Sequence, residues 1–275
     1  MNETIAAAGL AAVAQQDPER SARKYFEIEK RRPRLGSFFD AVYGGVWLGL
    51  LDDEQIAAIG QIYYAEQGPE WRSVGWTELG LKPWEDAVVT RYFDDRRRVI
   101  VGCAGAGREA FALARRGFDV VAFDCSPSMV GAGKWYAAGQ GLKVSFVFSA
   151  PDHVPDFGAH DGAIVGWGGI MHVVGSARRI AFLRRFRDHI PPGAPLLVSF
   201  YVRKEHEFGL AAAAAIGSGL RRLRGRPSLE LGDELRPRFY RHRFTRSEIE
   251  ATLRQAGFAL AEFSQGDEYA VGIAV

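Results

Sequence analysis

Residues 99–130 read VIVGCAGAGREAFALARRGFDVVAFDCSPSMV, and they carry the clearest evidence for the fold. A short apolar run, Val99–Val101, enters a turn that contains three glycines. The spacing of apolar residues over Arg108–Arg116 predicts a helix, and a second apolar run, Val120–Phe123, ends at Asp124. A strand, a connecting helix and a second strand in this order predict one unit of a parallel sheet.

The glycine turn and Asp124 together favour a ligand site. Gly105-Ala-Gly107 lets the backbone approach a bound group closely, and the helix after it offers free N–H groups. Asp124 ends the neighbouring strand at the same edge, where a carboxylate can accept hydrogen bonds from both hydroxyls of a ribose. The stretch therefore predicts a nucleoside-cofactor site at the carboxyl edge of the sheet. The glycines alone also fit a dinucleotide fingerprint, or a tight turn that binds nothing.

Apolar runs continue to alternate with helical segments further along the chain. The C-terminal part of the chain departs from this alternation. A capping box at Thr245–Glu248 begins a helix, and a strand–turn–strand pattern follows it. We expect an α/β fold with a Rossmann-like, mostly parallel seven-stranded sheet, a terminal antiparallel strand and helices on both faces. The expected strands are 99–101, 120–123, 144–148, 163–166, 195–201, 258–264 and 269–275.

Two segments lie outside this pattern. Residues 1–98 have mostly helical spacing, and we expect an N-terminal helical extension that includes a tryptophan-rich ordered loop. Residues 99–275 are expected to form the α/β domain, with an insertion at about 202–240. The extension and the insertion are the places where specificity for a substrate would be built.

The composition is that of an ordinary globular protein. The 275 residues are 47% hydrophobic, and 35 Lys and Arg against 33 Asp and Glu leave a net charge of +2. No global charge therefore points to nucleic acid or to an anionic membrane. Two cysteines exclude a disulfide framework and a structural zinc site, and no apolar run is long enough to cross a bilayer. The start of the chain is a poor secretory signal, so we expect a cytoplasmic protein.

Residues 99–129 resemble the cofactor-binding half of the class I S-adenosylmethionine-dependent methyltransferases. That family has an apolar strand, a G-x-G turn, a helix, a strand that ends in an acid, and then Ser-Pro and a Met. The corresponding residues here are Gly105-Ala-Gly107, Asp124, Ser126-Pro127 and Met129. With its weaker matches further on, the resemblance covers roughly 99–201 and 240–275.

The resemblance implies S-adenosylmethionine as the cofactor. The turn would hold its amino-acid end, Asp124 its ribose, and Cys125 and Met129 its adenine. This chain departs from the pattern at three places: Val101 stands near the usual strand-one acid, Cys103 near the usual first glycine, and Asp152 is a displaced candidate for the adenine amino group. The expected cofactor residues are Gly102, Cys103, Gly105, Gly107, Asp124, Cys125, Met129, Asp152, Gly166 and Trp167.

We expect a small-molecule acceptor and methylation at an oxygen atom rather than at a nitrogen atom. A hydroxyl acceptor benefits from a base that removes its proton. His172, shortly after strand four, is the best-placed candidate, and His206, after strand five, is the second. A structural or surface role is an equally good interpretation of either histidine. No cluster of carboxylates and histidines predicts a metal site.

Three other functions remain open from the sequence. Residues 221–246 hold nine arginines, which could bind RNA, although such a run is more often a solvated face. RNA methylation is therefore the first alternative. A nicotinamide-dependent oxidoreductase is the second, and a module that binds the cofactor without catalysis is the third.

Overall fold

The computed structural model describes residues 17–32, 36–67, 69–166, 168–204 and 207–275. The chain forms two compact units, each built from two separate stretches of sequence. We call them the helical unit, which comprises residues up to Ile62 together with Phe208–Tyr240, and the sheet unit, which comprises Tyr63–Glu207 together with Arg241–Val275. Residues 63–98 thus belong with the sheet, and residues 208–240 belong with the N-terminal helices.

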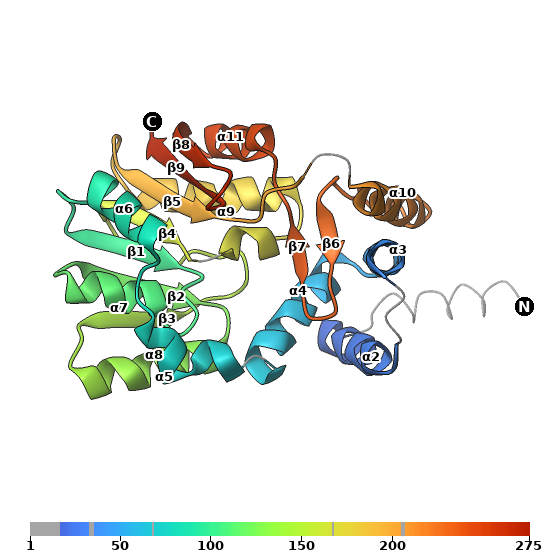
Figure 1. Cartoon of the computed structure of the whole chain (residues 1–275), viewed down its shortest axis with the longest axis horizontal. Helices are drawn as coiled ribbons and strands as arrows, with labels where there is room; N and C mark the ends of the chain where they lie inside the picture. Colours follow the sequence, from blue (N-terminus) through green and yellow to red (C-terminus); the bar gives the residue numbers. More distant parts are fainter. Residues whose placement is uncertain (1–16, 33–35, 68, 167, 205–206) are drawn as a thin grey trace, which may run out of the picture. The chain divides into compact units, whose positions relative to one another are not determined.

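The sheet unit contains a seven-stranded sheet in the order β3-β2-β1-β4-β5-β9-β8 (Figure 1). The first five strands in this order are parallel, and β9 runs antiparallel to both of its neighbours. This topology confirms the expected fold class. The strands are β1 Arg98–Gly102, β2 Asp119–Asp124, β3 Val144–Phe148, β4 Gly162–Val165, β5 Pro195–Ser199, β8 Phe258–Ser264 and β9 Tyr269–Ala274.

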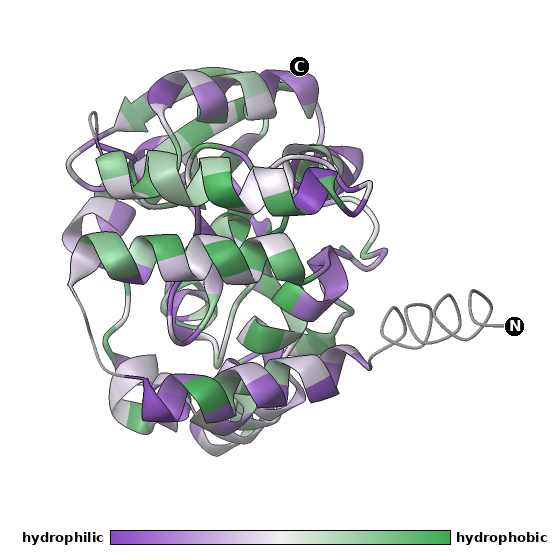
Figure 2. Cartoon of the chain, turned by 90° about the vertical axis from the view of Figure 1, so that its right-hand side faces the viewer, coloured by the Kyte–Doolittle hydropathy of each residue, from purple (hydrophilic) through white to green (hydrophobic). Residues whose placement is uncertain are grey.

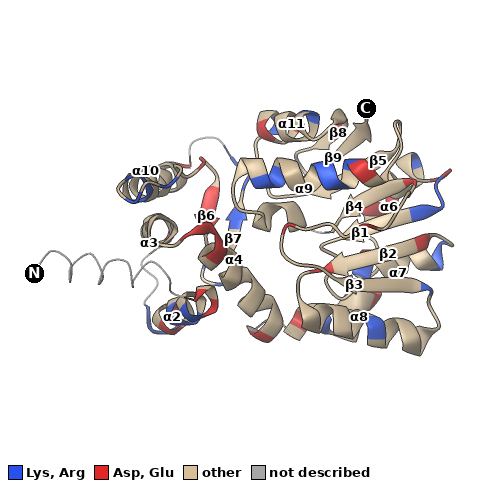
Figure 3. Cartoon of the chain, turned by 180° about the vertical axis from the view of Figure 1, so that it is seen from behind, with Lys and Arg blue, Asp and Glu red and all other residues tan. Residues whose placement is uncertain are grey.

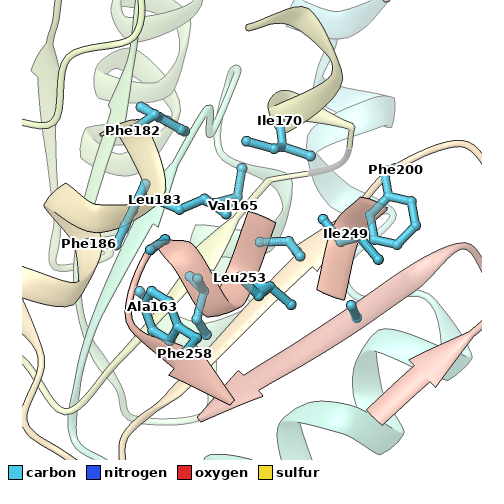
Figure 4. Packing of buried hydrophobic residues seen from close by; sticks show 14 of the residues in the cluster. Ala163, Val165, Ile170, Phe182, Leu183, Phe186, Phe200, Ile249, Leu253 and Phe258 are labelled. Carbon is cyan, nitrogen blue, oxygen red and sulfur yellow. The ribbon is translucent and has the colours of Figure 1, made fainter. Parts of the chain in front are cut away.

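Helices cover both faces of this sheet. Alternate strand residues point to opposite faces, and both faces carry apolar side chains that the helices bury. In β1, Ile100 belongs to one buried cluster, whereas Val99 and Val101 belong to the other. Figure 4 shows side chains of α9 and α11 beside Ala163 and Val165 in the first cluster. Residues of α6, α7 and α8 complete the second. These helices are α6 Pro83–Tyr92, α7 Arg108–Arg115, α8 Pro127–Gln140, α9 Ser176–His189 and α11 Arg246–Gln255.

Capping residues fix where these helices begin, as the sequence predicts. The Ser126 hydroxyl accepts a hydrogen bond from the Met129 N–H at 3.4 Å, and Pro127 is the first residue of α8. At α11, the Thr245 hydroxyl and the Glu248 carboxylate form a reciprocal capping box. The α8 cap lies directly after Asp124, so it also fixes the chain where β2 leaves the sheet.

The sheet unit also contains several short helical turns, most of them before β1. A π-helical turn, η1, spans Tyr63–Gln67. The tryptophan-rich segment that we expected to be an ordered loop contains a 3₁₀ turn, η2 Pro69–Arg72, and a short helix, α5 Val74–Glu78. A second 3₁₀ turn, η3 Gly169–His172, follows β4.

The helical unit packs helices from two distant parts of the sequence. It contains α2 Pro18–Arg31, α3 Ser37–Leu50, α4 Asp53–Ile62, α10 Phe208–Arg222 and the short strand β6 Asp233–Leu235, and its last residue begins β7 Tyr240–His242. Helices α3 and α10 lie side by side (Figure 2). A Cβ atom at Gly45 would lie 2.5 Å from the Ala213 carbonyl oxygen, so only glycine permits this close approach.

No described helix is long and apolar enough to span a membrane.

Candidate cofactor and acceptor site

The glycine turn after β1 occupies the carboxyl edge of the sheet, and its glycines have different roles. Gly107 has φ 102°, and a Cβ atom there would lie 2.5 Å from the Phe146 ring. Gly102 is packed just as tightly, 2.5 Å from the Phe186 ring by the same measure. At Gly105, with φ 55°, a Cβ atom would meet nothing within 4 Å. Gly102 and Gly107 therefore shape the turn, whereas Gly105 leaves an open face beside it.

Asp124 stands at the end of β2 and reaches into this turn. Its Oδ2 accepts the Gly105 N–H at 2.8 Å, and its Oδ1 accepts the Ser126 N–H at 2.8 Å. Burial raises the pKa of Asp124, and the backbone N–H donors of Gly105, Ser126 and Cys125 oppose that rise. A carboxylate has about four acceptor positions. Asp124 can therefore hold the turn and still accept hydrogen bonds from a ligand.

Cys103 and Cys125 lie at the carboxyl edge of the sheet, as expected, but their surroundings are those of packed, unreactive cysteines. Cys103 has a φ of 52°, which is unusual for a residue other than glycine. A Cβ atom at Gly169 would meet its side chain, so the Cys103 thiol packs against the turn after β4. Burial raises the pKa of both thiols, that of Cys125 to about 12. Neither is activated as a nucleophile.

Two of the residues expected around adenine, Met129 and Asp152, differ in their surroundings. Met129 is only 2% exposed and lies in the first turn of α8. Asp152 has a φ of 56° and forms an ion pair with Arg178 of α9. Burial raises the pKa of Asp152, and the Arg178 charge opposes this. In this structure the carboxylate proposed for the adenine amino group is thus held by an arginine that the sequence did not suggest.

The turn after β4 lies directly against the glycine turn. The Gly166 N–H donates to the Gly102 carbonyl at 2.7 Å, and a Cβ atom at Gly166 would lie 2.5 Å from the Cys103 carbonyl oxygen. The Gly168 N–H donates to the Ser199 hydroxyl at 3.0 Å. These bonds join the ends of β1, β4 and β5 into one surface. Trp167 lies outside the described residues.

His172 ends the η3 turn at this edge and has a partner from far away in the sequence. Its Nε2 lies 3.1 Å from the hydroxyl of Tyr64, which belongs to the π-helical turn η1. Burial is the main reason why the pKa of Tyr64 is raised above its usual value, and Asp124 and Tyr201 add to the effect. Tyr64 is therefore a neutral phenol that lies within the electrostatic reach of the ends of β2 and β5. His206 lies outside the described residues.

Tyr64 and Arg178 are candidate site residues that the sequence analysis missed. Tyr64 and His172 are 108 residues apart in the sequence, and no sequence pattern predicts that they meet. The π-helical turn that carries Tyr64 is a form frequently found at functional sites, but it has no reliable sequence signature. Arg178 belongs to a run of basic residues on α9 that is indistinguishable from a solvated face by pattern alone.

Comparison with known proteins indicates the class of protein in which this arrangement of residues occurs. Residues 99–193 match the model of a family described as a methyltransferase domain. The matched segment contains the glycine turn, Asp124 and the turn after β4. Residues 99–193 therefore form a methyltransferase domain with the features of the class I S-adenosylmethionine-dependent methyltransferases, whose cofactor is S-adenosylmethionine. A search of curated proteins found none that matches the sequence.

Solved structures agree in fold at low sequence identity. A SAM-dependent methyltransferase from Methanosarcina mazei has a TM-score of 0.57 and 16% identity, over 71% of this chain and 99% of that one. Magnesium protoporphyrin IX methyltransferase from Synechocystis with bound SAM gives 0.54 and 16%, over 82% and 98%. The 1,6-didemethyltoxoflavin-N1-methyltransferase of Burkholderia thailandensis gives 0.56 and 19%, over 81% and 89%.

The residues at the edge fit this cofactor. The open face at Gly105 is a place that a side chain would fill, so the turn leaves room for a bound group. Asp124, fixed by two backbone N–H groups, has a carboxylate that would accept hydrogen bonds from the ribose hydroxyls. Cys125 and Met129, the residues expected at adenine, follow Asp124 closely in the sequence. No described group of His, Cys, Asp and Glu residues could hold a metal ion.

Proposed function

We propose that this methyltransferase acts on a small molecule and methylates a hydroxyl oxygen, with Tyr64 and His172 as the proton-accepting pair. The observation that carries the proposal is the 3.1 Å contact between the Tyr64 hydroxyl and His172 Nε2. Both side chains are partly exposed, so an acceptor can reach them. A nucleophilic amine that is already neutral would not require such a pair.

The pair can remove a proton from an acceptor hydroxyl. The bound cofactor supplies an electrophilic methyl group, and a hydroxyl attacks it well only as its proton leaves. Tyr64 accepts the acceptor's proton at its oxygen while its own proton passes to His172 Nε2. The acceptor oxygen keeps the electron pair and uses it for the new bond to carbon. Because the pKa of Tyr64 is raised, the phenol itself does not hold a negative charge between turnovers.

The names of two structural neighbours support a small acceptor. Two of the structural neighbours are named for magnesium protoporphyrin IX and for 1,6-didemethyltoxoflavin, both of which are small molecules. The second name specifies N1, so the fold by itself does not select oxygen. Oxygen is favoured here by the Tyr64–His172 pair.

RNA is a poorer acceptor, because several arginines of the 221–246 run are held by acids and carbonyls. Arg221 is 5% exposed and pairs with Asp53 at 2.7 Å, and Arg236 pairs with the buried Glu234. Arg243 pairs with Glu207. Within this run, Figure 3 shows acidic residues on β6 beside basic residues on β7. This distribution favours a mixed surface over a phosphate-binding stripe.

The test is transfer of a carbon-13 methyl group from S-adenosylmethionine to pooled hydroxyl-bearing and amine-bearing metabolites, with total RNA as a separate acceptor. Carbon NMR distinguishes an O-methyl from an N-methyl product. We expect O-methyl products from the small molecules. Methylation of RNA alone, or only N-methyl products, would overturn the proposal.

Variants then test the proton-accepting pair on whichever product forms. Tyr64→Phe and His172→Asn should each lower kcat about 10²–10⁴-fold, the range for general base catalysis. The Kd for S-adenosylhomocysteine should change less than about twofold in both variants. His153→Asn, at an exposed histidine, is the matched control and should retain full activity. Equal losses of kcat and of cofactor affinity would indicate a structural role instead.

A further inference from the structure

The helical unit contains a cavity that the proposed proton transfer does not use. Its volume is about 220 Å³, several times the space that one water molecule needs. Three stretches of sequence line it: the second half of α2 with Arg32, the first half of α3, and residues 235–237 at the end of β6. Every described residue of the lining belongs to the helical unit.

Two buried hydrogen-bond donors at this cavity have no acceptor. The Tyr43 hydroxyl and the Arg236 Nε–H are removed from solvent, and neither has a hydrogen-bond partner among the described residues. Both residues line the cavity. A buried donor without an acceptor is costly, so such groups are normally satisfied by protein, water or a ligand. A molecule bound in the cavity would supply the missing acceptor.

The charged side chains of the lining, in contrast, are paired. Arg32 Nε lies 3.0 Å from a Glu29 carboxylate oxygen, and Arg32 Nη1 lies 2.5 Å from a carboxylate oxygen of Asp40. Arg236 Nη2 lies 2.6 Å from a carboxylate oxygen of Glu234. Each of these charges thus has an opposite charge beside it. The lining therefore calls for a hydrogen-bond acceptor rather than for a counter-ion.

The ion pairs also indicate which kind of acceptor fits. An ammonium group cannot accept a hydrogen bond. An anion would compete with the Glu29, Asp40 and Glu234 carboxylates for the same two guanidinium groups. An uncharged oxygen meets neither obstacle. A carbonyl oxygen has two lone pairs, so a single carbonyl group can accept hydrogen bonds from two donors.

We propose that this cavity binds a small, uncharged molecule whose carbonyl oxygen accepts hydrogen bonds from the Tyr43 hydroxyl and the Arg236 Nε–H. Leu235, Pro237 and the Tyr25 ring supply apolar surface for the rest of the molecule. The cavity is built from the N-terminal extension and the insertion, the two segments in which we expected substrate specificity. The molecule binds within the helical unit, so its binding does not depend on the proton-accepting pair or on which atom is methylated.

The test compares two probes of similar shape, acetophenone and ethylbenzene, of which only acetophenone has a carbonyl oxygen. Each is titrated into the full chain and followed by proton–nitrogen NMR through the Arg236 Nε–H signal, which is assigned by its absence in Arg236→Lys. Acetophenone should shift this signal and bind about two- to tenfold more tightly than ethylbenzene, as expected for a neutral hydrogen bond. Equal affinities, or a signal that acetophenone does not shift, would overturn the proposal.

The Tyr43→Phe variant separates ligand binding from a structural role, because it removes only the hydroxyl. Its affinity for acetophenone should fall about two- to tenfold, whereas its affinity for ethylbenzene should change less than about twofold. Since the hydroxyl has no hydrogen-bond partner among the described residues, the urea midpoint should not fall. Tyr92→Phe, which removes a hydroxyl bonded to Glu262 in the sheet unit, is the matched control and should leave both affinities unchanged. A lower midpoint for Tyr43→Phe with unchanged affinities would show that the hydroxyl serves the fold, and the proposal would then be wrong.

Discussion

Single residues at the carboxyl edge combine structural and chemical roles. Asp124 accepts hydrogen bonds from N–H groups of the glycine turn and of Ser126, before α8, and it is the residue that we expect to bind the ribose. His172 and Tyr64 meet through one hydrogen bond. One side chain here can serve both the fold and the ligand. A single-residue variant therefore needs a control that separates loss of stability from loss of ligand binding.

Asp124→Ala should weaken cofactor binding by about 1.5–3 kcal/mol, the range for hydrogen bonds to a charged group. The carboxylate is lost as an acceptor for the ribose hydroxyls and for the Gly105 N–H. Titration with S-adenosylhomocysteine measures the change. Asp119→Ala removes a carboxylate from the other end of the same strand and should leave the affinity unaltered. A folded Asp124→Ala protein with normal affinity would refute the role of Asp124.

Contacts between elements hold the site in place from both edges of the sheet. At the carboxyl edge, Gly166 and Gly102 bond the turns after β4 and β1. At the opposite edge, Asp161, just before β4, accepts the N–H groups of Arg97 and Arg98 at 3.0 and 2.8 Å. The start of β1 is therefore clamped to the start of β4, and this clamp depends on a negative charge.

The clamp at Asp161 predicts a pH-dependent contribution to stability. The backbone N–H of Arg98 is the main reason why the pKa of Asp161 lies below its usual value. A lowered pKa in the folded state gives stability above the unfolded pKa of about 3.9, and this stability is lost as pH falls through the folded pKa.

Asp161→Ala should therefore unfold more easily than the unaltered protein at pH 7, by about 1 kcal/mol. Urea unfolding of both proteins between pH 7 and pH 2 measures the difference. The difference should shrink only below about pH 4, where the unfolded carboxyl begins to take up a proton. A difference that stays constant to pH 2 would show that the carboxylate charge is not what stabilises the clamp.

At the scale of the whole molecule, each unit depends on partners far apart in the sequence. The sheet unit closes with β8 and β9 from the end of the chain. In the helical unit, Arg221 of α10 donates to the Leu48 carbonyl at the end of α3 and pairs with Asp53 of α4. The arginine run that suggested RNA binding thus supplies an internal contact of this unit.

Arg221→Ala should destabilise the protein by about 1–3 kcal/mol, because it removes several hydrogen bonds of a charged donor. Arg222→Ala changes a neighbouring, exposed arginine and should stay within about 0.5 kcal/mol of the unaltered protein. Urea unfolding measures both. Retention of RNA on a filter at low salt should be negligible for all three proteins. Strong, salt-sensitive retention that disappears in both variants would restore the RNA hypothesis.

Local rules were enough to predict the seven strands of the large sheet, the glycine turn, the helix caps and the position of Asp124. Alternation places Val99 and Ile100 on opposite faces, and Ser126-Pro127 starts a helix wherever the chain folds. The cofactor edge could therefore be predicted.

The side-chain pairs that are distant in the sequence could be identified only from the folded structure. Tyr64 contacts His172, Glu85 pairs with Arg108, and Arg178 holds Asp152. Each pair joins elements that no periodicity connects. Their contacts result from packing against a shared sheet, and a π-helical turn sets the direction of Tyr64. The physical reason is that local propensity fixes backbone form, whereas side-chain encounters depend on how whole elements pack.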